Sequence, residues 1–197
     1  MKKIIIGNWK LNLDHLEAIQ LLQKLNYTIE EGKEEKIDIV VSPSHTSLRS
    51  IQTIIDTDKL NIQLSAQDVS QFSGGAYTGE VSSHQLNKLS VNYCIVGHSE
   101  RRIELNESDE VINQKVHNLV SEGIIPIVCF GETLEQRNSN KYLEHITNQI
   151  NSAVKGLRKD KVENLVFAYE PIWAIGTGEV ASLEAVSYTH LRAHETG

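Results

Sequence analysis

Short apolar runs alternate with longer amphipathic stretches along the chain, and this alternation is the feature that most restricts the fold. The runs begin near six positions, Ile4, Ile37, Asn61, Val91, Ile124 and Leu165. Successive runs start 24 to 41 residues apart, which is room for a strand, a helix and two connections. Several runs are nearly all apolar, as strands buried on both faces should be: residues 4–6, 37–41, 124–130 and 165–169. The pattern predicts six βα units and a parallel sheet with right-handed crossovers.

The stretches between these runs carry helix signals. One stripe at helical spacing, with Ser108 as its expected N-cap and Gly123 as its stop, consists of Ile112, Val116, Leu119 and Val120. A second stripe, ending at Gly32, consists of Leu16, Ile19, Leu22 and Leu25. Periodicity does not choose between an open doubly wound sheet and a closed barrel. No G-x-G-x-x-G follows the first run, which disfavours a dinucleotide-binding sheet.

Charge and cysteine content exclude several classes of protein. The 197 residues fit one domain, and a net charge of −7 without a basic block makes a nucleic acid partner unexpected. Cys94 and Cys129 lie in apolar runs without metal-ligand spacing, which indicates buried thiols in a reducing compartment. The apolar patch at residues 4–6 is too short for a secretion signal or a membrane span. We therefore expect a soluble cytoplasmic protein that does not bind membranes.

Polar residues gather directly after the apolar runs, where the reactive groups of βα proteins collect. They are Asn8, Lys10, Gln67, Asp68, His98, Glu100 and Glu170. Taken singly, each is expected to be a capping or solvated loop residue. Because the carboxyl ends of parallel strands share one rim, their convergence indicates a site.

The most informative stretch is LVFAYEPIWAIGTGEVAS at residues 165–182. An apolar strand ends in Glu170, and Pro171, which has no N–H, ends the strand there. The next four residues, 172–175, are too apolar for a solvated loop, and the glycines of 176–178 permit backbone rotation. The segment predicts a carboxylate at the rim followed by a loop that closes over a ligand.

Six segments, in order and spacing, resemble the triosephosphate isomerase family. They are GNWKLN (7–12), AQDVS (66–70), GGAYTGE (74–80), IVGHSERR (95–102), PIVCFGETLEQR (126–137) and AYEPIWAIGTGEVAS (168–182). The resemblance covers residues 1 to about 185, and the last segment is close to specific for the family. It implies a parallel (β/α)8 barrel that interconverts dihydroxyacetone phosphate and D-glyceraldehyde 3-phosphate through an enediol(ate). It also implies a step of glycolysis and gluconeogenesis that needs no cofactor and no metal.

The resemblance implies roles for five rim residues. Glu170 resembles the base that takes a proton from the carbon next to the carbonyl, and His98 the electrophile that polarises that carbonyl. In this family the histidine is neutral and held near a helix N-terminus. Lys10 resembles the cation that holds the anionic substrate, and Asn8 a donor to the developing oxyanion. Glu100 resembles a supporting carboxylate near His98 and Lys10.

Further expectations follow from the loops. In this family a loop closes over the substrate, and residues 171–180 match it, with the Gly176 N–H donating to the phosphate. Residues 74–80 resemble a loop that docks into a second subunit and brings Thr78 to its active site, which implies a homodimer. Cys129 matches a cysteine of the family, and its expected role is packing rather than catalysis.

The chain also departs from the family pattern. Six βα units are present where a complete barrel has eight, and the phosphate donors of the seventh and eighth loops have no counterpart. We expect an incomplete barrel domain at residues 1–186 and a foreign or disordered tail at 187–197. Two alternatives to an isomerase remain open: an inert fragment that only binds or associates, and, more weakly, a retaining glycosidase using Glu100 and Glu170.

Overall fold

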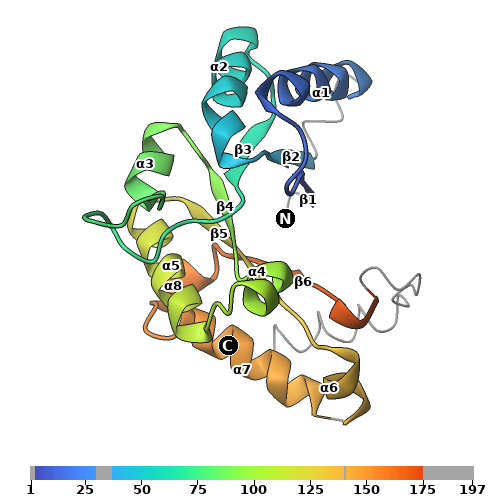
Figure 1. Ribbon diagram of the computed structural model, residues 1–197, viewed down its shortest axis with the longest axis vertical. Coiled ribbons are helices and arrows are strands. Elements are labelled where there is room, and N and C mark those ends of the chain that lie inside the picture. Colours follow the sequence, from blue (N-terminus) through green and yellow to red (C-terminus); the bar gives the residue numbers. More distant parts are fainter. Residues whose placement is uncertain (1–2, 30–36, 140, 175–197) are drawn as a thin grey trace. The chain divides into compact units, whose positions relative to one another are not determined.

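Six parallel strands with helices between them make up the part of the chain described by the structure, a computed structural model covering residues 3–29, 37–139 and 141–174 (Figure 1). The strands are β1 (Lys3–Asn8), β2 (Ile37–Ser42), β3 (Gln63–Ala66), β4 (Tyr93–Val96), β5 (Ile125–Phe130) and β6 (Val166–Tyr169). All six coincide with the apolar runs of the sequence, which confirms the predicted strands.

The strands lie in the order β1-β2-β3-β4-β5-β6, which decides between the two parallel architectures. Pairing is parallel from β1 through β4 and again between β5 and β6, where Cys129 is opposite Ala168. A doubly wound sheet reverses its strand order at a switch point, whereas a barrel adds each strand beside the last. The sequential order is that of a (β/α)8 barrel, and the described residues form six of its strands.

The helices follow the strands as the periodicity predicts. They are α1 (His15–Thr28), α2 (Leu48–Asp58), α3 (Ser83–Lys88), α4 (Ser99–Glu104), α5 (Asp109–Ser121), α6 (Leu134–Asn138), α7 (Tyr142–Val154) and α8 (Lys159–Val162). Two short 3-10 turns, η1 (His45–Ser47) and η2 (Ile172–Ala174), complete the set. At α5 the Val111 N–H donates to the Ser108 hydroxyl over 3.4 Å, and Gly123 has a φ of 76°, so both predicted ends are confirmed.

The chain forms two compact units. The first contains residues 1–95 and 118–126, and the second contains residues 96–117 and 127–197. In the first, apolar side chains of α1, α2 and the early strands are buried, among them Leu22, Val40 and Ile51. In the second, Phe130, Ile146 and Ile150 form a buried cluster against which Tyr142, Phe167 and Tyr169 pack.

Several predictions about burial are wrong, including the one for β6, whose four residues are all only half-buried. Residues 4–6 are not buried on both faces, because β1 pairs only with β2 among the described strands and Ile5 is 58% exposed. In α1 the buried residues are Ala18 and Leu22, whereas Leu16 is 59% exposed. The buried face of the helix is therefore rotated from the predicted stripe. By contrast, β4 is buried throughout and β5 almost throughout, as expected of strands covered on both faces.

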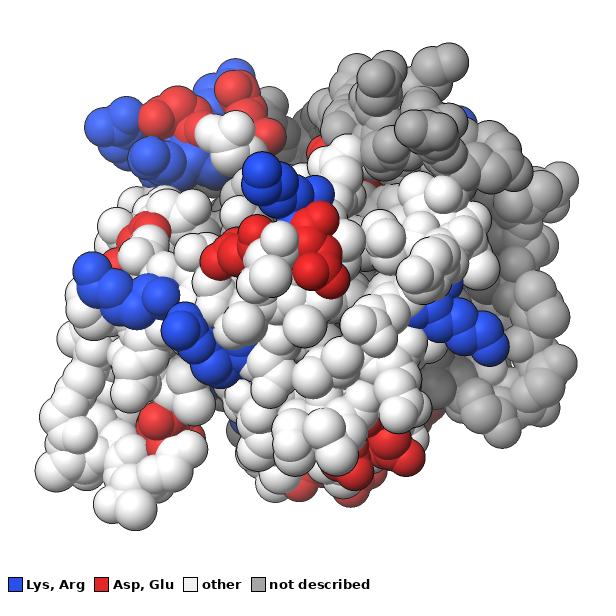
Figure 2. Space-filling view, turned by 90° about the horizontal axis from the view of Figure 1, so that it is seen from above, with Lys and Arg blue, Asp and Glu red and all other residues white. Residues whose placement is uncertain are grey.

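Charged side chains of both signs are interspersed on the face drawn in Figure 2, where lysines and arginines form no continuous patch. No helix of the described ranges is long and apolar enough to cross a bilayer.

Candidate active site

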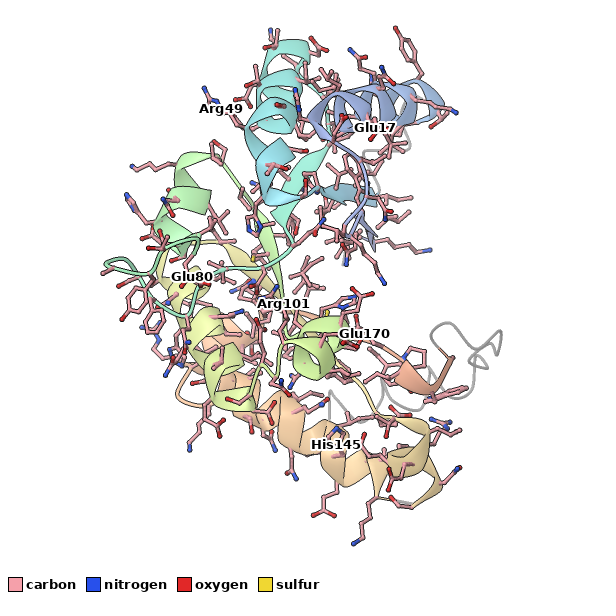
Figure 3. The ribbon with its side chains drawn as sticks, in the orientation of Figure 1. Glu17, Arg49, Glu80, Arg101, His145 and Glu170 are labelled. Atoms are coloured by element: carbon pink, nitrogen blue, oxygen red, sulfur yellow. The ribbon has the colours of Figure 1, made fainter. Side chains whose placement is uncertain are left out.

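His98 and Glu170 form the centre of the candidate site, in the second unit. His98 follows β4 and Glu170 follows β6, so the ends of two strands present them. His98 Nε2 lies 2.9 Å from Glu170 Oε1, and the side chains are only 12% and 16% exposed. Figure 3 shows the Glu170 side chain beside α4, whose first residue, Ser99, donates its N–H to Glu170 Oε2 over 2.8 Å. The two principal residues predicted from the sequence therefore lie in contact.

A backbone N–H beside His98 indicates which tautomer the neutral ring adopts. His98 is the N-cap of α4, and its Nδ1 lies 3.2 Å from the Glu100 backbone nitrogen, whose N–H it accepts. An imidazole nitrogen that accepts a hydrogen bond carries no proton, so the proton of the neutral ring is on Nε2. This assignment follows from the hydrogen-bond network. Nε2–H then donates to Glu170, and the arrangement supplies a neutral donor beside a carboxylate.

Gly97, which precedes His98, and Arg102 of α4 together fix the backbone next to His98. Gly97 has a φ of 69°, and a Cβ there would lie 3.0 Å from the Ile112 side chain and 3.1 Å from the Arg102 guanidinium. Only glycine satisfies both the conformation and the space. Arg102 in turn donates from Nε to the Gly97 carbonyl over 2.8 Å and pairs with Asp109 at 2.6 Å. The backbone at Gly97 is therefore fixed by its close packing against Ile112 and by its hydrogen bond from Arg102.

Glu170 is held in its ionised form. Burial raises the pKa of its carboxyl, but the hydrogen bond and electrostatic interaction with His98, together with the hydrogen bonds from Ser99, outweigh burial and lower the pKa from its ordinary value. Burial also raises the pKa of the Cys129 thiol well above its usual value, and the neighbouring Glu170 carboxylate adds to this. Cys129 therefore stays a neutral thiol, in agreement with its expected packing role.

Asn8 and Lys10 belong to the first unit, where they share a tight turn after β1. Lys10 has a φ of 52°, a left-handed conformation that is uncommon outside glycine and is often found at functional sites. Its N–H donates to Asn8 Oδ1 over 3.0 Å, and its carbonyl accepts from Gln67 Nε2 over 2.9 Å. Gln67 also donates to the Ser42 carbonyl over 2.9 Å, so the end of β3 ties down the ends of β1 and β2.

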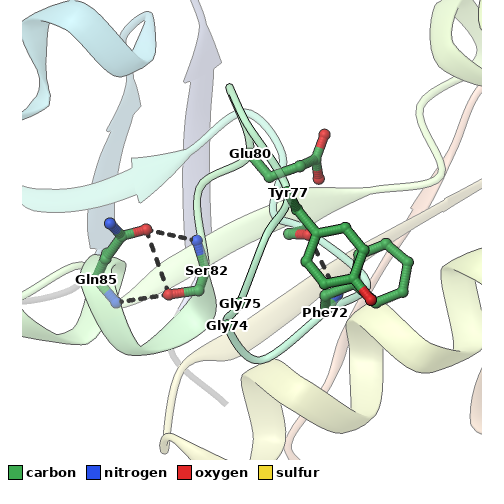
Figure 4. A pocket seen from close by; sticks show the side chains of 8 residues that line it. Phe72, Gly74, Gly75, Tyr77, Glu80, Ser82 and Gln85 are labelled. Atoms are coloured by element: carbon green, nitrogen blue, oxygen red, sulfur yellow. Dashed lines mark hydrogen bonds between the residues drawn. The ribbon is translucent and has the colours of Figure 1, made fainter.

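Of the remaining predicted residues, Glu100 lies beside His98, Thr78 belongs to the first unit, and Gly176 falls outside the described ranges. Glu100 is 54% exposed, with Oε2 3.6 Å from His98 Nδ1. Thr78 lies in an exposed loop of the first unit. Beside it is a pocket of about 230 Å³, drawn in Figure 4 and lined by Ser70, Phe72, Gly74, Gly75, Tyr77, Glu80, Ser82 and Gln85. Gly176 and most of the expected closing loop fall outside the described residues.

A buried carboxylate next to the site was not predicted. Glu132 is fully buried, and its Oε1 accepts from Arg137 at 2.7 Å, from the Tyr169 hydroxyl at 2.9 Å and from Trp173 Nε1 at 3.1 Å. The Arg137 guanidinium also stacks 4.6 Å from the Trp173 ring. Glu132 thus binds the residues on both sides of the Glu170–Pro171 segment. Glu132 follows the fifth apolar run, just as the predicted site residues follow other runs. This position is the sequence signal that could have identified it.

The site contains the two kinds of group needed to move a proton between carbons. A carboxylate can accept a proton from carbon, and a neutral N–H donor can stabilise the charge that develops on oxygen. Within residues 3–29, 37–139 and 141–174, no three His, Cys, Asp or Glu side chains come together as a metal site.

The sequence was compared with known families and curated proteins. The model of the triosephosphate isomerase family matches residues 3–196. The chain belongs to this family. The triosephosphate isomerase of Saccharopolyspora erythraea is 50% identical over 179 residues, which are 91% of this chain and 69% of that protein. Those of Corynebacterium efficiens and Streptomyces avermitilis are 49% and 46% identical over 181 residues each, with 92% of this chain covered and 69% and 70% of the relatives.

Membership of the triosephosphate isomerase family confirms the predicted fold and family and removes the glycosidase alternative. The family match extends into residues 187–196, which were expected to be a foreign tail and which lie outside the described residues.

Proposed function

We propose that the chain carries out its family's reaction, the interconversion of dihydroxyacetone phosphate and D-glyceraldehyde 3-phosphate, with Glu170 as the base and His98 as the electrophile. The observation that carries the proposal is the 2.9 Å contact between the half-buried Glu170 carboxylate and His98 Nε2. The reaction requires these two groups on neighbouring atoms of one substrate. The proposed reaction is a step of glycolysis and gluconeogenesis, and it needs no cofactor.

The proton transfers follow from the charges of the two groups. Ionised Glu170 removes a proton from the carbon next to the carbonyl, and the electron pair of that C–H bond moves onto the carbonyl oxygen. His98 Nε2–H donates to this oxygen, so the negative charge of the enediolate is stabilised as it forms. Protonated Glu170 then returns the proton to the adjacent carbon, while His98 moves a proton between the two oxygens. The carboxylate and the imidazole end as they began.

The resemblance to the family assigns further roles to Lys10, Asn8, Gly176 and Glu100. The Lys10 ammonium attracts the dianionic phosphate of the substrate and the charge on the oxyanion, and the Asn8 amide donates to that oxyanion. The left-handed turn that fixes Lys10 supports this role, because such backbone is retained where surrounding contacts hold it. Gly176 would donate its N–H to the phosphate, and Glu100 would act on His98 as a supporting carboxylate.

We infer a homodimer in the cytoplasm, on separate grounds. Loop 74–80 resembles the family's docking loop. It presents Tyr77, which is 44% exposed and stacks on Phe72 with ring centroids 3.6 Å apart. Exposed aromatic side chains such as Tyr77 are enriched at surfaces that contact another protein. Cys94 and Cys129 are buried and reduced, which fits a reducing compartment.

The test is turnover of the purified chain with each triose phosphate. Glu170→Gln keeps the shape of the side chain and removes the base, so turnover should fall by about a hundredfold or more. Glu163→Gln, an exposed glutamate a few residues away, is the matched control and should leave turnover unchanged. A wild-type chain with no more turnover than Glu170→Gln would favour the inert fragment that only binds or associates.

A further inference from the structure

The backbone of Glu170 lies directly against Gly131, the residue that follows β5. A Cβ at Gly131 would overlap the carbonyl oxygen of Glu170 and would lie 2.9 Å from its carbonyl carbon. On its other side Glu170 donates its backbone N–H to the Phe130 carbonyl over 2.8 Å. The φ of Gly131 is not in the left-handed region, so glycine is required here by space and not by conformation. The peptide joining Phe130 to Gly131 therefore contacts the backbone of Glu170 and positions it.

That peptide is held from the opposite side by a side chain of α7. Gln149 is only 6% exposed, and its Oε1 accepts the Gly131 N–H over 2.9 Å. Its Nε2 donates to His145 Nε2 over 3.0 Å, which orients the amide so that oxygen faces Gly131. Because this N–H is buried, losing the acceptor would leave it without a partner, and the peptide would have to move to find one.

We propose that Gln149 is a positioning residue for the base and acts through the Gly131 peptide. The proposal rests on the proposed role of Glu170. The contacts form a continuous path: Gln149 holds Gly131, Gly131 supports the Glu170 backbone, and the Glu170 carboxylate reaches Ser99 and His98. A base misplaced by about 1 Å can cost about a hundredfold in rate, so a small shift of this peptide matters.

Three variants separate positioning from packing. Gln149→Met keeps the length of the side chain and removes the acceptor. Gln149→Glu keeps an acceptor oxygen for the Gly131 N–H and should retain the position of the Gly131 peptide. Asn148→Met changes the neighbouring, exposed position of α7 and is the matched control. If Gln149→Met does not fold, Gln149→Asn takes its place, because the shorter amide keeps its polarity but not its reach.

The first readout does not depend on turnover. The Ser99 amide donates to the Glu170 carboxylate, so its nitrogen and proton NMR signals report where the carboxylate lies and when it titrates. In Gln149→Met the Ser99 signals should move and the titration midpoint of Glu170 should rise, because the carboxylate loses the contacts that keep it ionised. Asn148→Met should keep the signals and the midpoint close to wild type, and Gln149→Glu should keep the Ser99 signals close to wild type at a pH where Glu170 is ionised. Unchanged Ser99 signals and titration in a folded Gln149→Met or Gln149→Asn protein would overturn the proposal.

The second readout is the split between kcat and KM. Gln149→Met should lower kcat by about tenfold to a hundredfold with KM changed by less than about twofold, because a displaced base weakens the transition state and not substrate binding. Equal kcat for Gln149→Met and Asn148→Met would overturn the proposal. If wild type shows no turnover while the Ser99 signals move as expected, the proposed function fails and the positioning contact is supported.

Discussion

Replacing Glu132 by leucine should destabilise the fold, because it removes one acceptor from three donors at once. Leucine matches the size of glutamate, so little change in volume is involved. The carboxylate is fully buried and accepts from Arg137, Tyr169 and Trp173 at 2.7 to 3.1 Å. Removing one partner of a buried ion pair costs about 3 to 5 kcal/mol when the remaining charge stays buried.

The expected loss is smaller than that range because the donors can reach water. The Arg137 side chain is 28% exposed, and Tyr169 and Trp173 are half-buried. Discounting for this solvation gives a fall of about 2 to 4 kcal/mol in the free energy of unfolding. At about 2 to 4 °C per kcal/mol for a chain of this size, the melting temperature should drop by about 4 to 16 °C.

The assay is urea unfolding followed by circular dichroism, with Glu135→Leu as the control on the exposed surface of α6. The double variant Glu132→Leu with Arg137→Leu should recover part of the loss, because no charge is then left without its partner. A loss below about 1 kcal/mol for Glu132→Leu alone, or a double variant less stable by the full sum of both changes, would refute the reasoning.

Three further predictions concern the base, acid stability and the chain end. Glu170→Asp shortens the carboxylate by one methylene and should lower kcat by about a hundredfold with little change in KM; unchanged kcat would show that Glu170 is not the base. Burial raises the pKa of Glu107, but Arg101 and Lys115 outweigh it, so the folded pKa lies below the ordinary 4.5. The stability this carboxylate contributes is complete above pH 4.5 and is lost as pH falls through the lower folded value, so urea midpoints should decline there in wild type and less in Glu107→Gln. Deleting residues 187–197 should shift the melting temperature by no more than a few degrees; a larger fall would show that they belong to the fold.

The strands and the central pair were predictable because their signals are local. An apolar run that ends in Glu170 and Pro171, or in Gly97 and His98, is visible in consecutive letters, and parallel strands bring such ends to one rim. The resemblance to the family added the roles. The burial of β1 was mispredicted for the same local reason, since Ile5 is apolar whether or not another element covers it.

The supporting residues were not predictable because their signals are tertiary. Gln149 is one polar residue among several on an ordinary helix, and only the fold places its amide against Gly131. Gly131 has no unusual φ that a turn motif would mark, and its reason for being glycine is a strand end 39 residues later, at Glu170. Likewise, the residues next to Lys10 in the sequence do not predict its left-handed backbone. Its carbonyl accepts a hydrogen bond from Gln67, which is distant in the sequence.

The capping of α4 by His98 makes a folding event and a chemical state depend on each other. A ring protonated on Nδ1 has no lone pair for the Glu100 N–H, so imidazolium and a capped first turn exclude each other. Conversely, formation of α4 (Ser99–Glu104) favours one of the two neutral tautomers of His98. In that tautomer the proton is on Nε2, which faces Glu170. The capped first turn of α4 therefore requires the neutral ring whose Nδ1 accepts and whose Nε2 carries the proton.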